Sequence, residues 1–108
     1  MDFTTYQTAA RKTALYADAY RVTYPALGLA SEAGEVAGKV KKVLRDRDGE
    51  FGDEQIAAIK DELGDVLWYV ATLAADLGLD MADIAAGNVE KLRSRLERNV
   101  IQGDGDKR

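Results

Sequence analysis

The sequence contains no cysteine and no histidine. Disulfides, zinc sites of the usual kind and catalytic pairs built on Cys or His are therefore excluded, as are di-iron sites that use a Glu-x-x-His motif. No segment approaches transmembrane length, and the apolar core of a signal peptide is missing from the N-terminal residues MDFTTYQTAARK. We therefore expect a cytoplasmic protein that does not enter a membrane.

The composition is that of an ordinary folded protein, with 46% hydrophobic and 31% charged residues. A chain of 108 residues fits one domain, which we place at residues 1–108. The net charge of −4 argues against non-specific nucleic-acid binding. Because so short a chain buries only a moderate share of its surface, self-association is one way to complete its core.

The apolar residues recur at helical spacing along most of the chain, which contains a single proline, Pro25. This pattern predicts four helices, at about residues 4–19, 25–44, 54–77 and 80–99. Gly78 is a typical helix stop, and Asp80 is suited to cap the last helix. We expect the Gly- and Asp-rich tail at about residues 100–108 to be loose unless it meets a partner. The predicted fold is all-α and four-helix bundle-like, completed by homo-oligomerisation.

Two pairs of acidic residues, Glu32 with Glu35 and Glu62 with Asp65, lie within the predicted second and third helices. The members of each pair are three residues apart, so they share a helix face. Each pair also borders an apolar stripe, where unpaired carboxylates would be costly to bury. A hard divalent cation, Mg²⁺ or Mn²⁺, is the natural counterion for four such acids.

Further polar side chains could join these acids. Lys39 falls on the face of Glu32 and Glu35, and Tyr69 falls on the face of Glu62 and Asp65. The fourth predicted helix presents three polar residues on one face: Asn88, Lys91 and Arg95. Carboxylates that hold Mg²⁺ beside Lys and Arg donors are typical of a polyphosphate site.

Each feature also has a purely structural interpretation. The acidic pairs could be solvated faces, with Glu35 and Lys39 forming an i, i+4 ion pair. The polar face of the fourth helix could be a solvated edge. Trp68 is more often a core or interface residue than a base-stacking platform, and Tyr69 suits core packing and substrate contact about equally.

With these motifs in order, the sequence resembles the MazG-like nucleoside triphosphate pyrophosphohydrolases, an all-α family. The resemblance covers about residues 24–98 and is carried by three segments: GLASEAGEVAGKVKK, DELGDVLWYVA and NVEKLRSR. They are similar to the family's E-E-x-x-E motif, its E-x-x-D motif and a later Asn-x-x-Lys-x-x-x-Arg stretch. The YQ near the start and the terminal GDGDKR also resemble one small single-domain branch.

The resemblance implies hydrolysis of nucleoside triphosphates between the α and β phosphates, giving a monophosphate and pyrophosphate. It implies a catalytic Mg²⁺ centre whose ligands are Glu32, Glu35, Glu62 and Asp65. It implies triphosphate binding by Lys39, Asn88, Lys91 and Arg95, and contacts to sugar or base from Tyr69 and Trp68. A homodimer or homotetramer that shares its sites between chains, and a role in nucleotide-pool house-cleaning, are also implied.

One position departs from the family pattern, because Ser31 stands where the first motif begins with Glu. The general base is therefore open between a metal ligand such as Glu35, the nearby Asp61, and metal-bound hydroxide. Two other functions compete with this one. The chain could be a non-catalytic module for oligomerisation or nucleotide binding, or a phosphohydrolase that cuts another phosphate bond.

Overall fold

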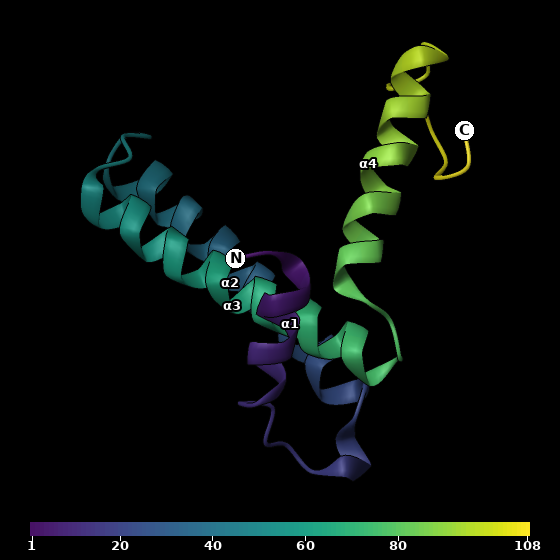
Figure 1. Ribbon diagram of the computed structural model, residues 1–108. Coiled ribbons are helices and arrows are strands. Elements are labelled where there is room, and N and C mark those ends of the chain that lie inside the picture. The colour runs from purple at the N-terminus through teal and green to yellow at the C-terminus, as the bar shows by residue number, and fades with distance from the viewer.

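The computed structural model describes residues 1–108 and contains four α-helices, one short 3₁₀ turn and no strand. The elements in chain order are α1 (Phe3–Arg11), the 3₁₀ turn η1 (Asp18–Tyr20), α2 (Thr23–Asp46), α3 (Asp53–Asp76) and α4 (Met81–Glu97) (Figure 1). The all-α class is confirmed, and the last three helices lie close to their predicted bounds. None of the helices combines the length and apolar character needed to cross a membrane.

The turn between α3 and α4 forms as the sequence predicts. Gly78 adopts a φ of 73°, and the amides of Gly78 and Leu79 donate to the carbonyls of Ala75 and Ala74. This is a Schellman turn, which ends a helix where glycine tolerates a left-handed backbone. The Asp80 side chain then caps α4 by accepting from the Ala82 amide at 2.9 Å.

The first helix is shorter than predicted, because it ends at Arg11 rather than near Ala19. Contacts with the distant α3 explain the difference. The Asp76 carboxylate accepts from the Tyr16 hydroxyl at 2.7 Å and from the Val22 amide at 2.9 Å. These charge-assisted bonds draw residues 12–22 around the end of α3, and such tertiary contacts override local helix preference.

The long helices α2 and α3 form an antiparallel hairpin, and they pack side by side over most of their length (Figure 1). The turn between them, residues 47–52, contains Gly49 at a φ of 80°. Helix α1 crosses the α3 side of this hairpin. We refer to α2, α3 and their connecting turn as the hairpin.

The small buried core lies at the junction of α1, α3 and α4, around Ala10, Ala71 and Met81. Gln7 fastens this junction, since its amide nitrogen donates to the carbonyls of Ala71 and Leu79 and its oxygen accepts from the Met81 amide. One buried side chain therefore links three elements and fixes where α4 begins.

Beyond this junction α4 leaves the hairpin and stands apart from it (Figure 1). The radius of gyration is 16.7 Å, well above the ~13 Å expected of a compact chain of this size. A single chain therefore does not close a four-helix bundle. Large apolar side chains remain exposed on α3 and α4, among them Leu63, Leu67, Val89, Leu92 and Leu96. Homo-oligomerisation stays a prediction.

Candidate metal centre

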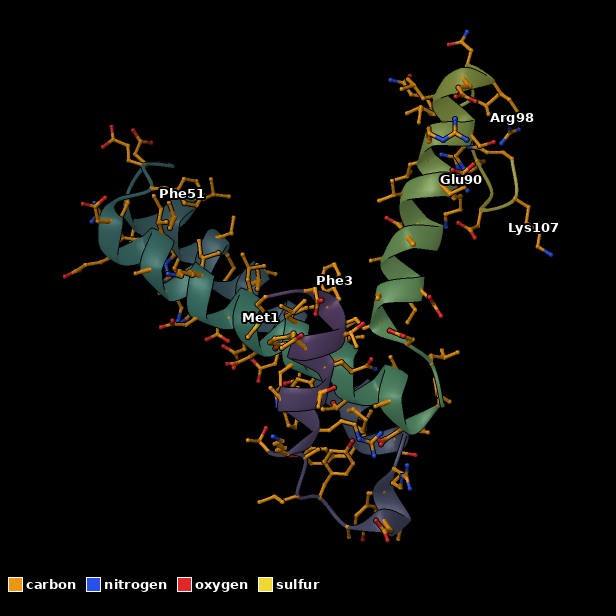
Figure 2. The ribbon with its side chains drawn as sticks, in the orientation of Figure 1. Met1, Phe3, Phe51, Glu90, Arg98 and Lys107 are labelled. Atoms are coloured by element: carbon orange, nitrogen blue, oxygen red, sulfur yellow. The ribbon has the colours of Figure 1, made fainter.

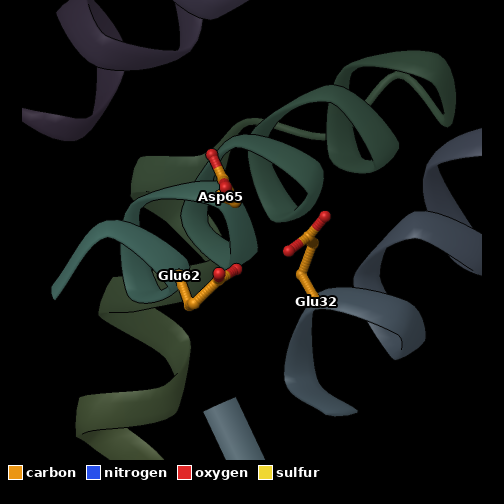
Figure 3. A group of neighbouring side chains, drawn as sticks. All are labelled: Glu32, Glu62 and Asp65. Atoms are coloured by element: carbon orange, nitrogen blue, oxygen red, sulfur yellow. The ribbon is translucent and has the colours of Figure 1, made fainter. Parts of the chain in front are cut away.

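Three carboxylates meet in the middle of the hairpin. Glu32 projects from α2, and Glu62 and Asp65 project from α3 toward it (Figure 3). One oxygen from each residue lies within 4.8 Å of the others. The two α3 residues meet because a spacing of three places them on one helix face, and the antiparallel pairing of α2 brings Glu32 opposite them.

The negative charge in this cluster exceeds the positive charge beside it. Lys39 Nζ lies 3.6 Å from Glu62 Oε1, and one ammonium cannot balance three carboxylates. The pKa of Glu32 is raised, first by a hydrogen bond shared with the Glu62 carboxyl, then by burial and by the charges of Glu62, Asp65 and Glu35. Glu32 and Glu62 are partly buried, which strengthens the repulsion. A bound cation would relieve it.

The donor set suits a hard divalent cation. All three groups offer carboxylate oxygens, the ligands that Mg²⁺ and Mn²⁺ prefer, and the chain has no Cys thiolate or His imidazole that would favour a softer metal. Asp65 is exposed, so one side of the cluster is open to solvent and to a ligand.

Glu35 lies outside the group of three. It is exposed on α2, one turn beyond Glu32, and is close enough for its charge to raise the pKa of Glu32. It does not pair with Lys39, whose ammonium lies near Glu62 instead. The structure therefore gathers three of the four predicted ligands, and the role of Glu35 stays a prediction.

Tyr69 lies beside the cluster on the same face of α3. Burial, the Tyr24 hydroxyl and then the charges of Glu32 and Asp65 raise its pKa. The ring passes directly over Gly28 of α2, where an added Cβ would lie 2.2 Å from Tyr69 Cε1. Gly28 is therefore required for this approach.

Two tyrosines near the acids were not identified from the sequence as site residues. Burial and the Asp65 charge raise the pKa of Tyr6, which places this α1 residue near the cluster. Tyr24 lies 6.3 Å from Tyr69, measured between ring centroids. Tyr6 falls on an apolar stripe of the first helix, and that pattern gave no signal beyond core packing.

Trp68 faces α1 rather than the open side of the hairpin. Its indole nitrogen donates to Thr13 Oγ1 at 2.8 Å, and its ring packs against the core at the junction. It also meets the Tyr69 ring edge-on, at 5.0 Å between centroids. These contacts give Trp68 a structural role, and its contact with substrate stays a prediction.

The three predicted residues of α4 are not joined to the acids within one chain. Asn88 is exposed, while Lys91 and Arg95 bind Asp106 of the C-terminal tail, with Lys91 Nζ 2.8 Å from Asp106 Oδ1. Figure 2 shows Glu90, Arg98 and Lys107 on this same part of the molecule, far from Phe51 at the hairpin turn. We refer to α4 and residues 98–108 as the arm.

Comparison with known proteins finds relatives of this sequence. A family model described as the MazG nucleotide pyrophosphohydrolase domain matches residues 24–100, which include α3, α4 and all but the first residue of α2. The "Gene 37 protein" of Mycobacterium phage L5 is 47% identical over 109 residues, covering 95% of this chain and 96% of that protein. The "Uncharacterized protein YvdC" of Bacillus subtilis (strain 168) is 36% identical over 74 residues, covering 64% of this chain and 70% of that protein. No solved structure matches.

Proposed function

The chain belongs to the MazG nucleotide pyrophosphohydrolase family, and we propose that it is a Mg²⁺-dependent enzyme that hydrolyses nucleoside triphosphates between the α and β phosphates. The observation that carries this proposal is the three-carboxylate cluster on the hairpin, which lies within the region that matches the family. We assign Mg²⁺ as the cofactor, with Mn²⁺ as a substitute, since both prefer oxygen ligands.

Glu32, Glu62 and Asp65 would hold the cation between α2 and α3. Bound there, a divalent cation supplies neutralisation and orientation of the phosphate oxygens. Lys39, 3.6 Å from Glu62, is placed to shift toward phosphate oxygens once the carboxylates have a stronger counterion. Tyr69 and Tyr24 border the cluster on the other side and offer aromatic surface for the nucleoside.

The reaction adds a water oxygen to the α phosphorus and breaks the bond from that phosphorus to the bridging oxygen. The bridging oxygen keeps the electron pair and leaves with pyrophosphate. We propose that Glu35 is the general base that accepts the proton from the attacking water. It is an exposed carboxylate beside the cluster but outside its three ligands, so it retains a free lone pair for general-base work.

The arm supports a site shared between chains. Asn88, Lys91 and Arg95 are remote from the acids of their own chain, and the apolar residues of α3 and α4 are exposed. We propose a homodimer or homotetramer in which α4 of one chain completes the site of another. In a cytoplasmic setting this enzyme would remove surplus or modified nucleotides.

A non-catalytic nucleotide-binding module is the second candidate, and Ser31 favours it. The deciding experiment offers Mg²⁺ and a panel of standard and modified ribo- and deoxyribonucleoside triphosphates in ¹⁸O-labelled water. The proposal expects pyrophosphate from a subset of nucleotides, with the label in the monophosphate. If orthophosphate is the only phosphate product, the enzyme cleaves a phosphate bond other than the one between the α and β phosphates. If no nucleotide gives a product, the binding module is favoured.

A further inference from the structure

A cavity of about 400 Å³ lies between the second half of α2 and the first turns of α3, toward the turn of the hairpin. This volume falls within the range of small-ligand sites. Six of the eight lining residues are polar or charged, and only two are hydrophobic.

The charges in the cavity favour an anion. Lys39, Lys42 and Arg47 line it together with Asp46 and Glu54. The Asp46 carboxylate already receives two bonds from the Arg45 guanidinium, at 2.7 and 2.9 Å. Lys39 is likewise paired, 3.6 Å from Glu62 Oε1. Lys42 and Arg47 are therefore the two cavity cations without an ion-pair partner, and they face one such acid, Glu54.

The Arg47 side chain bends back over the turn of the hairpin. Its Nε donates to the Glu50 carbonyl at 3.2 Å, which leaves the outer nitrogens of the guanidinium with donors to spare. Gly52 provides the space, because a Cβ there would lie 3.1 Å from an outer nitrogen of Arg47 and 2.7 Å from Gln55 Oε1. The Arg47 guanidinium therefore lies against Gly52 at the turn of the hairpin.

Lys39 lies between the cavity and the metal centre. This residue lines the cavity, and its ammonium lies 3.6 Å from Glu62. Lys42 is three residues further along α2, about 4.5 Å along the helix axis. Phosphate oxygens that extend from the acids toward the hairpin turn would therefore meet the cations in sequence.

The order of groups along the hairpin gives the substrate a direction. Tyr24 and Tyr69 lie on the far side of the acids, where Tyr69 covers Gly28. The sequence of surfaces is thus aromatic, acidic and then basic. A nucleoside triphosphate has the same order: an aromatic base, the α phosphate beside the metal, and a highly charged polyphosphate end.

We propose that this cavity is a pyrophosphate subsite, in which Lys42 and Arg47 bind the β and γ phosphates of the substrate and then the pyrophosphate product. The inference rests on the proposed function and adds the position and direction of the leaving group. It also adds two cations of the hairpin, Lys42 and Arg47, to those that the arm of another chain would bring to the site.

Calorimetric titration of inorganic pyrophosphate in the presence of Mg²⁺ tests the subsite directly. The test protein is the double variant Lys42→Gln with Arg47→Gln. The matched control is Lys41→Gln with Lys60→Gln, which removes the same charge from exposed hairpin residues that do not line the cavity. We expect the dissociation constant to rise on the order of tenfold in the test variant. The charge-conserving swap Lys42→Arg with Arg47→Lys should retain most of the affinity, and nucleoside monophosphate should bind all variants alike.

If pyrophosphate binding weakens equally in the test and control variants, the effect is one of overall charge and the subsite is wrong. The subsite is also wrong if the test variant binds pyrophosphate as tightly as wild type. The enzyme assay separates this failure from failure of the proposed function. If wild type releases pyrophosphate but the test variant keeps its KM and its product inhibition, the subsite is wrong and the function stands. If wild type has no activity, the function is wrong, and the titration still decides whether the cavity binds pyrophosphate.

Discussion

The hairpin holds a cluster of acids, the arm presents two of the predicted phosphate-binding cations, and the two regions are held in different ways. The hairpin gathers three carboxylates between two long helices that support each other along their length. The arm carries Lys91 and Arg95 on a helix that touches the rest of the chain mainly at its base. The acids are therefore assembled by the fold of one chain, while the arm's cations lie apart from those acids within the same chain.

The largest expected effect comes from the hairpin. Replacing Glu62 by Gln removes one charge from the cluster at a partly buried position. We expect the rate of pyrophosphate release to fall about 100-fold or more, because metal affinity is lost with the ligand. Steady-state assays at saturating nucleotide measure this, with Glu50→Gln in the exposed hairpin turn as control. If the Glu62→Gln protein reacts at the wild-type rate, the carboxylate cluster of the hairpin is not part of the active site.

The next effect concerns the junction of α1, α3 and α4, where the hairpin meets the arm. Gln7→Ala leaves the Met81 amide and the carbonyls of Ala71 and Leu79 without their side-chain partner. We expect the free energy of unfolding to drop by about 2 kcal/mol, since buried polar groups lose their bonds. Urea unfolding followed by circular dichroism measures the change. Thr8→Ala is the control, because that hydroxyl bonds only to a carbonyl of its own helix. If the two variants have the same free energy of unfolding, Gln7 does not stabilise the junction.

A mixing experiment tests whether the arm acts on another chain. Lys91→Gln should lower activity on the order of tenfold by removing one phosphate contact. If sites combine the hairpin of one chain with the arm of another, mixing Lys91→Gln with Glu62→Gln should restore about a quarter of wild-type activity in a dimer. Activity that equals the mean of the two separate proteins would place each complete site within one chain.

The smallest effect concerns the tail. A hydrogen bond from Lys91, then the bond from Arg95 and the positive charge of both, lower the pKa of Asp106 below its ordinary value of 3.8. A lowered pKa means that the contact is present at neutral pH and is lost as the pH falls below that value. Asp106→Asn should loosen residues 100–108 at neutral pH, seen as faster amide hydrogen exchange. Asp104→Asn should not, since the Asp104 side chain makes no ion pair or hydrogen bond with α4. Similar exchange in both variants would show that Asp106 does not hold the tail.

Local patterns were enough to predict most of the fold. Helical spacing gave α2, α3 and α4, and the stop at Gly78 and the cap at Asp80 follow from backbone chemistry within a few residues. The end of α1 was missed because it depends on Asp76, which is 60 residues from Tyr16 and 54 from Val22 in the sequence. No local signal records such a contact.

The candidate site, like the fold, was predictable only where it depends on spacing within a helix. Spacing within a helix correctly placed Glu62 beside Asp65, and pairing of the two helices brought Glu32 to them. Spacing could not tell that Glu35 lies outside the group, that Trp68 turns toward Thr13, or that α4 leaves the hairpin. These outcomes depend on how the helices are rotated and oriented, which the apolar pattern of each helix does not fix.

The central claim is that the carboxylates of the hairpin form a divalent-cation site without help from the arm. Titration with Mn²⁺, followed by electron paramagnetic resonance without nucleotide, tests it most directly. The account predicts that wild type and Asp106→Asn bind Mn²⁺ alike, that Glu62→Gln binds it at least tenfold more weakly, and that Mg²⁺ competes for the same site. Equal Mn²⁺ binding by wild type and Glu62→Gln would contradict the account.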